Sequence, residues 1–423
     1  MVFIKILRPH MILSISKISN IFLRFSSVGS KFVLIFFLAK ELQPIEVGLF
    51  GLLSATITFS ALLIGGDYYT YTQRELTLDN KEHNGKVLFN HIAAICIIYG
   101  ITLPLHYLLF ILDILPYSFL FMFYLILVSE HISQDIMRIL IILKMPLIAS
   151  LLLNIKTAVW ITILVTSATL NNTNNLDLSS VFYYWLAGSF SSVVFGLLFI
   201  NKSIAYTSFS LNNNSYLING FKVASFFLLS TISLKIIFTL DRYILEAYYG
   251  LEVVAAYTLL FGIAMSLSTI IDAGVMSFKY PQMIFFFREK KFAEFLSIKR
   301  SLQKEIILWS LILSLLTYIT TPYALALIEK PMYLEQTKNM LAPLLLMTFF
   351  YNIALVPHYQ LYAQGKDKEI LISNILLPIV FIVTSFLLIK VNISYSAIPT
   401  ALAITMIANF LFKFSFSRKY KIS

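Results

Sequence analysis

Long apolar stretches recur about every 35 residues from Ile21 to Phe416, separated by short polar breaks. A helix needs about 20 apolar residues to cross the roughly 30 Å hydrocarbon core of a bilayer, where backbone groups find no water. The pattern therefore predicts an all-α polytopic membrane protein with about twelve transmembrane helices. They are expected at residues 19–39, 47–65, 87–112, 115–141, 146–169, 179–200, 221–247, 251–276, 304–328, 339–363, 369–390 and 395–417.

Basic residues are divided unevenly between the two sides of the membrane that an even number of helices defines. Twenty-three Lys and Arg residues fall on the side of the termini, and only Lys40, Lys330, Lys338 and Lys390 fall opposite. The positive-inside rule then predicts that both termini are cytoplasmic. Met1–Leu13 has no small-residue cleavage site after a clean apolar region, so it is interpreted as a cytoplasmic lead-in and not as a signal peptide.

The longest polar break is Ser277–Glu305, whose FFFREKKFAEFLSIKR run alternates aromatic and basic residues. We expect a cytoplasmic loop that contains an amphipathic helix lying in the membrane interface, and recruitment of a partner is the alternative. The breaks on the opposite side are all short. The sequence therefore predicts no extracytoplasmic domain in which chemistry takes place.

Two similar segments indicate an internal repeat. Glu46 in PIEVGLFGLL and Glu252 in GLEVVAAYTLL stand at matching junctions, each followed by an apolar helix. The match predicts two six-helix lobes in parallel orientation, residues 1–205 and 206–423.

Composition supports the membrane interpretation and excludes several other classes. With 59% hydrophobic and 13% charged residues, the chain cannot cover itself with polar surface, so lipid is its main solvent. The net charge of +11 lies mainly in the polar breaks, which argues against a nucleic-acid partner. Cys96 is the only cysteine, the six histidines show no ligand spacing, and no phosphate-binding GxxxxGK[ST] loop is present. We therefore expect neither a metal site nor a cofactor.

Three lysines fall near the middle of expected helices, namely Lys31, Lys156 and Lys235. Each costs at least about 2.5–3.5 kcal/mol to insert at bilayer depth, a cost that is tolerable when the ammonium group faces water or an anion. The sequence therefore predicts that they face a polar space. The alternative is neutralisation inside the protein by Glu130 or Asp135.

Arg24 and Arg242 extend this basic character along two helices. Arg24 precedes Lys31 by seven residues, and Arg242 follows Lys235 by seven. This spacing places each pair about 20° apart around a helix and roughly 10 Å apart along it. Each helix is therefore expected to present a basic stripe, although both arginines lie close enough to helix ends for snorkelling to the headgroups.

The segment SEHISQDIMR brings Glu130, His131, Gln134, Asp135 and Arg138 onto one face of a helix, within about 140° of arc. A face this polar must point into the protein or toward water. Internal pairing, such as Asp135 with Arg138, is one interpretation. A proton or ion relay through Glu130, His131 or Asp135 is the other.

Several segments resemble the O-antigen and polysaccharide-export flippases (Wzx-type) of the multidrug/oligosaccharidyl-lipid/polysaccharide exporter superfamily. The resemblance covers nearly the whole chain and depends on the order of its segments. One departure is Tyr68, which stands where the family has a glycine after the acidic Asp67, and it puts a latch between Asp67 and Arg74 in doubt. The segments are LAKELQPIEVGLFGLL, GGDYYTYTQREL, SEHISQDIMRIL, DRYILEAYYGLEVVAAYTLLFGIA, YPQMI and LYAQGKDKEILISNI.

The resemblance implies two six-helix bundles around a central cationic cavity, alternating access and no enzymatic activity. The implied substrate is an undecaprenyl-pyrophosphate-linked oligosaccharide that moves from the cytoplasmic to the periplasmic leaflet of a bacterial inner membrane. Its implied partners are membrane lipid, a coupling proton or sodium ion, and a glycan polymerase with its chain-length regulator. Contact with the anion or glycan is assigned to Lys31, Lys156 and Lys235, with Arg24 and Arg242 as guides. Ion coupling is assigned to Glu130, His131, Asp135 and Asp272.

Two other functions remain open from the sequence. A small-molecule antiporter of the same superfamily would share the fold, but export of organic cations requires acidic groups at mid-membrane, where the excess here is basic. A membrane glycan polymerase would be equally hydrophobic, but it normally needs a large extracytoplasmic loop.

Overall fold

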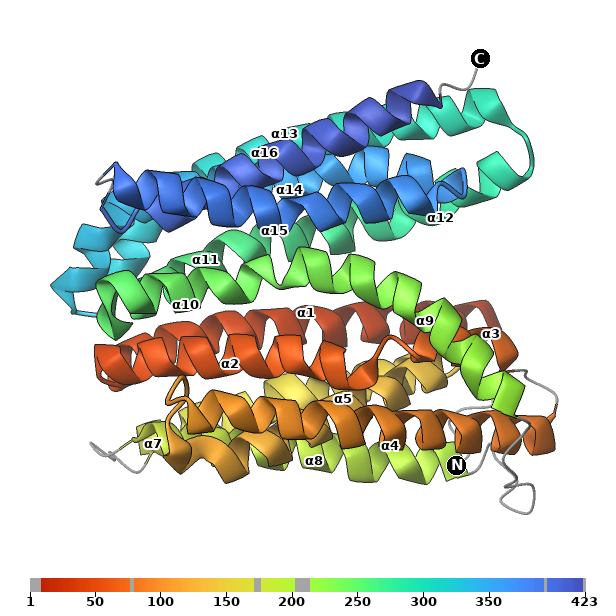
Figure 1. Cartoon of the computed structure of the whole chain (residues 1–423), viewed down its shortest axis with the longest axis horizontal. Coiled ribbons are helices and arrows are strands. Elements are labelled where there is room, and N and C mark those ends of the chain that lie inside the picture. Colours follow the sequence, from red (N-terminus) through yellow and green to blue (C-terminus); the bar gives the residue numbers. More distant parts are fainter. Residues whose placement is uncertain (1–8, 77–79, 171–175, 202–213, 392–393, 421–423) are drawn as a thin grey trace. The chain divides into compact units, whose positions relative to one another are not determined.

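The computed structural model describes residues 9–76, 80–170, 176–201, 214–391 and 394–420, and these residues are almost entirely helical (Figure 1). The Met1–Leu13 lead-in lies partly outside the described residues. Eleven of the described helices are long and apolar enough to cross a membrane. α5 is not one of the eleven; it has 23 residues and carries Glu130, Asp135 and Arg138. With α5 included, the expectation of an all-α polytopic protein with about twelve membrane helices is confirmed.

The helices follow the chain as expected, with several longer than the sequence indicated. Their bounds are α1 Pro9–Glu41, α2 Pro44–Gly65, α3 Tyr69–Glu75, α4 Lys81–Ile111, α5 Leu120–Ile142, α6 Pro146–Asn154, α7 Trp160–Leu170, α8 Leu178–Ile200, α9 Asn214–Lys235, α10 Ile237–Tyr249, α11 Leu251–Ile271, α12 Ser277–Arg288, α13 Phe292–Ala326, α14 Pro331–Ala363, α15 Asp367–Lys390 and α16 Ala397–Lys419.

Local chemistry determines where several of these helices begin and end. Asn80 accepts a hydrogen bond from the His83 amide at 2.9 Å and so caps α4. Pro331 occupies the first position of α14, where a missing amide hydrogen costs nothing. Gly250 has φ of 82°, a conformation that favours glycine, and it separates α10 from α11.

Three predicted helices contain irregularities that the sequence pattern did not reveal. The helix expected at 146–169 contains a π-helical segment at Ile155–Val159, and the helix expected at 251–276 contains one at Asp272–Met276. The helix expected at 221–247 is interrupted at Ile236, directly after Lys235. Because π-helical turns concentrate at functional sites, the positions of Lys156 and Asp272 within them are informative.

The expectation of a long polar loop at Ser277–Glu305 is wrong. α12 continues from α11 to Arg288, and α13 begins at Phe292, so only a three-residue turn separates them. Lys290 in this turn has φ of 57°. The apolar aromatic residues of the segment continue the helices past the point where the hydropathy pattern predicts that the membrane ends.

The described residues divide into two compact units. One comprises residues up to Leu34 together with Thr56–Leu228, and the other comprises Ile35–Ala55 together with the residues from Leu229 onward. α1 and α2 thus contribute to both units. The lobe boundary predicted at residue 205 stays a prediction, as does a cavity between lobes.

Close packing explains why the α1–α2 connection belongs to the second unit. The Lys330 ammonium group donates to the carbonyl oxygens of Ala39, at 2.8 Å, and Leu42, which are unpaired acceptors at the end of α1. Gly48 of α2 lies so close to the Leu251 carbonyl at the start of α11 that a Cβ at this position would collide with it. The segments that carry Glu46 and Glu252 therefore pack near one another at their amino-terminal ends.

Candidate functional site

Lys156, in the π-helical segment between α6 and α7, forms a buried ion pair. Its ammonium nitrogen lies 2.7 Å from the Glu130 carboxylate of α5 and 3.0 Å from the Glu130 carbonyl oxygen. The other carboxylate oxygen of Glu130 accepts a hydrogen bond from the Trp185 indole at 2.8 Å. Neutralisation by Glu130, one of the two interpretations of the sequence, is thus the arrangement observed for Lys156.

The other two lysines have a different environment. Lys31 and Lys235 both have exposed side chains, and Lys31 lies within electrostatic range of Glu130 and Lys156. Arg24 is also exposed and donates to the Ser150 hydroxyl at 3.2 Å. The first unit therefore brings together an ion pair and, within electrostatic range of it, the additional charged side chain of Lys31.

Arg242 is fixed inside the second unit. Its guanidinium group lies 3.1 Å from the carboxylate of the adjacent Asp241 and 2.7 Å from the Phe238 carbonyl oxygen, and it stacks 4.7 Å from the Phe261 ring centroid. The Tyr257 hydroxyl donates to the same carboxylate. These contacts fix the position of Arg242. The seven-residue spacing from Lys235 did not predict any of them.

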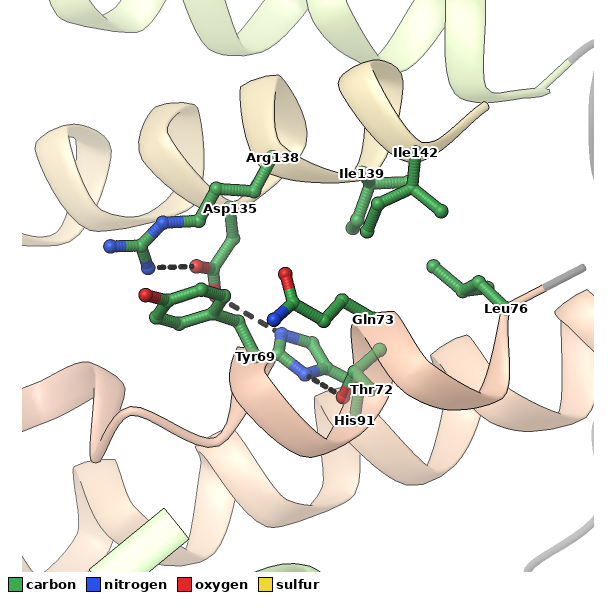
Figure 2. A pocket seen from close by; sticks show the side chains of 9 residues that line it. All are labelled: Tyr69, Thr72, Gln73, Leu76, His91, Asp135, Arg138, Ile139 and Ile142. Atoms are coloured by element: carbon green, nitrogen blue, oxygen red, sulfur yellow. Dashed lines mark hydrogen bonds and ion pairs between the residues drawn. The ribbon is translucent and has the colours of Figure 1, made fainter. Parts of the chain in front are cut away.

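Asp135 is the centre of a second polar cluster in the first unit. One carboxylate oxygen lies 3.0 Å from His91 of α4 and 3.3 Å from His131 of α5, and the other accepts from Arg138 at 3.1 Å. Figure 2 shows Asp135 and Arg138 on one side and His91 reaching toward the carboxylate from the other. Both interpretations of this helix face, internal pairing and a relay, are compatible with the contacts.

The cluster continues through hydroxyl groups. Thr72 of α3 bonds to the second ring nitrogen of His91 at 2.8 Å, and Tyr99 of α4 bonds to that of His131 at 2.7 Å. Arg138 stacks 3.5 Å from the ring centroid of Tyr69. Asp135 is thus linked by hydrogen bonds through the His91 imidazole to α3, whereas the His131 imidazole lies beside the carboxylate without a hydrogen bond to it. Such a chain of titratable and hydroxyl groups can hold a proton at several positions.

A small cavity of about 10 Å³ adjoins Asp135, His91 and Arg138 (Figure 2). This volume is at the lower limit for a single water molecule, so the cluster has no room for a sugar. Among the described residues, no group of three or more His, Cys, Asp or Glu side chains is arranged to hold a metal ion. Asp272 is exposed and belongs to the second unit, whereas the cluster belongs to the first.

Tyr68, which departs from the pattern of the resembling family, is fully buried. Its ring contacts His91 and Phe221, and its hydroxyl occupies space that a Cβ on Gly220 would need. Burial raises the pKa of Tyr68 to about 12. The bulk of Tyr68 is therefore accommodated by a glycine far along the chain. Arg74 lies over the Phe227 ring at 5.7 Å.

The sequence did not single out His91, Thr72, Tyr99, Asp241 or Trp185. His91 lies 44 residues from its partner Asp135, so local spacing gave no signal for it. Asp241 was adjacent to a residue already singled out. Its acidic side chain within a membrane helix was a signal that could have been used.

The comparisons with known proteins agree with this architecture. A family model described as "Polysaccharide biosynthesis protein" matches residues 17–286, more than half of the chain. The chain belongs to the polysaccharide biosynthesis protein family. The resemblance that its motifs indicated is thereby confirmed at the level of the family. A search among curated protein sequences finds no significant match.

Several solved structures share the fold. A MATE transporter in complex with MaL6 is 15% identical, with a TM-score of 0.65 over 95% of this chain and 94% of that chain. An outward-facing multidrug resistance MATE family transporter is also 15% identical, with a TM-score of 0.64 over 96% and 95%. A MOP superfamily transporter from Pyrococcus furiosus is 13% identical, with a TM-score of 0.61 over 96% and 95%. The chain therefore has the fold of these MATE transporters.

Proposed function

We propose that this protein is a flippase that carries an undecaprenyl-pyrophosphate-linked oligosaccharide, such as an O-antigen repeat unit, across a bacterial inner membrane. The observation that carries the proposal is the combination of a polysaccharide biosynthesis family with a MATE transporter fold. Polysaccharide synthesis needs its lipid-linked intermediate on the far side of the membrane, and an alternating-access fold supplies the transfer.

Basic residues within the membrane helices are proposed to bind the pyrophosphate of this substrate. Lys31 and Lys235 are exposed, and a pyrophosphate is an anion that ammonium groups hold through charge-assisted hydrogen bonds. Lys156 is paired with Glu130, so we propose that it positions Glu130 and Trp185 and reaches the substrate only if this pair opens. Arg24 is proposed to guide the pyrophosphate, whereas Arg242 serves to hold α10 against α11.

The alternative is a small-molecule antiporter, because the same fold occurs in a multidrug resistance transporter. The Pyrococcus furiosus transporter is described as having a binding pocket of reverse polarity that suggests a different function. We apply the same logic here. Exposed lysines favour an anionic substrate. They would repel the organic cations that a multidrug exporter carries.

Energy for transport is proposed to come from protons through the His91–Asp135–His131 cluster. Sodium prefers a shell of oxygen ligands, whereas Asp135 is surrounded by two imidazoles and a guanidinium group. Both termini are proposed to lie in the cytoplasm, following the distribution of basic residues. A polymerase and a chain-length regulator are the proposed partners.

Complementation in a bacterium that lacks its own O-antigen flippase tests the function. Substituting Lys31 or Lys235 with Gln should abolish surface polysaccharide at unchanged protein levels, and Arg should restore part of it, because charge matters more than shape. Full function of K31Q/K235Q would refute the role of the two lysines. Normal polysaccharide with altered resistance to organic cations would support the antiporter instead.

A further inference from the structure

A groove on α13 has properties that the proposed transport function does not use. It is an open hollow of about 540 Å³ that is lined by a single helix. The lining residues all come from the first part of α13 and recur at helical spacing, so they form one face of this helix. They are Ala293, Leu296, Ser297, Arg300, Ser301 and Lys304.

The groove carries an unneutralised positive charge. Arg300 and Lys304 are exposed, and neither forms an ion pair within the described part of the chain. The nearest acid along the helix is Glu305, whose carboxylate is engaged by Lys279 of α12. Lys279 also donates to the Ser301 hydroxyl at 2.7 Å, and this hydroxyl in turn donates to the Glu305 carboxylate at 3.4 Å. The groove therefore combines two free cations with the hydroxyl group of Ser297, a set of donors suited to phosphate oxygens.

The same face of α13 becomes apolar immediately beyond the groove. Leu308, Leu311 and Leu315 follow Lys304 at helical spacing and are 54%, 54% and 63% exposed. α13 has 35 residues and is about 52 Å long, well beyond the roughly 30 Å hydrocarbon core. Leu308 to Leu315 can thus lie against acyl chains while Arg300 and Lys304 reach the headgroup level.

The membrane side of the groove follows from the connections within the second unit. A short turn joins α13 to α14, so the start of α13 and the end of α14 lie at the same end. The end of α14 packs on the end of α16, where Gln360 donates to the Ser417 carbonyl oxygen at 3.1 Å and Gln364 to that of Tyr420 at 2.9 Å. By the proposed topology, this end faces the cytoplasm.

We infer that this face of α13 is a binding site for an anionic phospholipid of the adjacent leaflet. Arg300, Lys304 and the Ser297 hydroxyl hold the phosphate of the headgroup, and the acyl chains lie along Leu308, Leu311 and Leu315. Positive charge near a membrane surface attracts anionic lipid, and here the charge, hydroxyl groups and apolar stripe are collinear on one helix. The site is independent of the transported substrate.

The test uses the full chain, purified in detergent and stripped of lipid, with native mass spectrometry to count bound lipids. Phosphatidylglycerol is titrated against phosphatidylcholine. R300Q/K304Q should weaken binding of the first phosphatidylglycerol on the order of tenfold, while leaving phosphatidylcholine unchanged. The charge-preserving R300K/K304R should stay within about threefold of the wild type. Phosphatidylglycerol binding should also persist in the presence of an excess of free glycerol phosphate.

The matched control is K290Q/K291Q, which removes two charges from the turn before α13, outside the groove. It should bind phosphatidylglycerol like the wild type. Equal weakening by both double variants would show diffuse attraction to a basic surface and would overturn the site. Unchanged binding by R300Q/K304Q would do the same. Complete displacement of phosphatidylglycerol by glycerol phosphate would show an anion site without lipid specificity. If R300Q/K304Q weakened only the binding of an undecaprenyl pyrophosphate probe, the groove would belong to the transported substrate.

Discussion

The ammonium nitrogen of Lys156 lies 2.7 Å from the carboxylate of Glu130. Both groups come from helices that cross the membrane, and the lysine is carried by a π-helical segment. A pair of this kind is sensitive to loss of one member, because the remaining charge stays buried without a partner.

A double-mutant cycle measures this dependence. Lys156→Ala should destabilise the protein by roughly 3–5 kcal/mol, since it leaves Glu130 unpaired, and Glu130→Ala should have a similar cost. The double variant should be more stable than the sum of the two effects indicates. Thermal unfolding in detergent provides the values. Additive effects would show that the two side chains are energetically independent.

Coupling to protons should depend on Asp135. In proteoliposomes, an imposed pH gradient should accelerate transport by the wild type, and a sodium gradient of the same size should not. Asp135→Asn should remove the acceleration, because the two imidazoles then lose the adjacent negative charge that favours their protonation. Asp177→Asn is the matched control, since Asn also caps α8. Acceleration by sodium, or retained pH dependence in Asp135→Asn, would contradict the proton relay.

The contact between α2 and α11 makes a sharp prediction about two glycines. Gly48→Ala should destabilise the protein by about 1–3 kcal/mol, because the added methyl group meets the backbone of Leu251, which has little freedom to move. Gly100→Ala in α4 is the control, as no atom lies within 4 Å of its added Cβ. It should be neutral or slightly stabilising, since alanine favours helix. Similar melting temperatures for the two variants would mean that this packing is not tight.

Reporter fusions test the orientation that the basic residues predict. A fusion at Ser423 should report a cytoplasmic location, and one at Asn174, in the break between α7 and α8, should report the opposite side. Both positions lie outside the described residues. Reporters on the same side would exclude an odd number of membrane crossings between them and would contradict the twelve-helix topology.

Much of the fold follows from the sequence because a bilayer imposes a length and a polarity on each helix. The apolar stretches located the membrane helices, and the polar face of α5 is turned inward, with His131 and Asp135 buried. Hydropathy does not detect a single extra residue per turn, so the π-helical segments at Lys156 and Asp272 were missed. It also marks where lipid ends and not where a helix ends, which explains the error at Ser277–Glu305.

The candidate site was predicted less completely, because its contacts join distant parts of the chain. Asp135 and Arg138 are three residues apart in the sequence, and their pairing was among the interpretations of the sequence. His91 and Thr72 come from other helices and could not be placed beside Asp135 without a structure. Helical spacing placed Arg242 on a stripe with Lys235, yet adjacent Asp241 engages its guanidinium group, a contact that side chains one residue apart on a helix rarely make.

The most direct test of the proposed function is transfer of a lipid-linked glycan by the purified protein in proteoliposomes. An undecaprenyl-pyrophosphate-linked oligosaccharide is distributed over both leaflets, and an external glycosidase cleaves only what is exposed outside. Wild-type protein should make the inner-leaflet fraction accessible over time, and K31Q/K235Q should slow this at least tenfold at equal reconstitution. If the wild type leaves the inner fraction protected while it exports an organic cation, the protein is a small-molecule antiporter and the flippase account is contradicted.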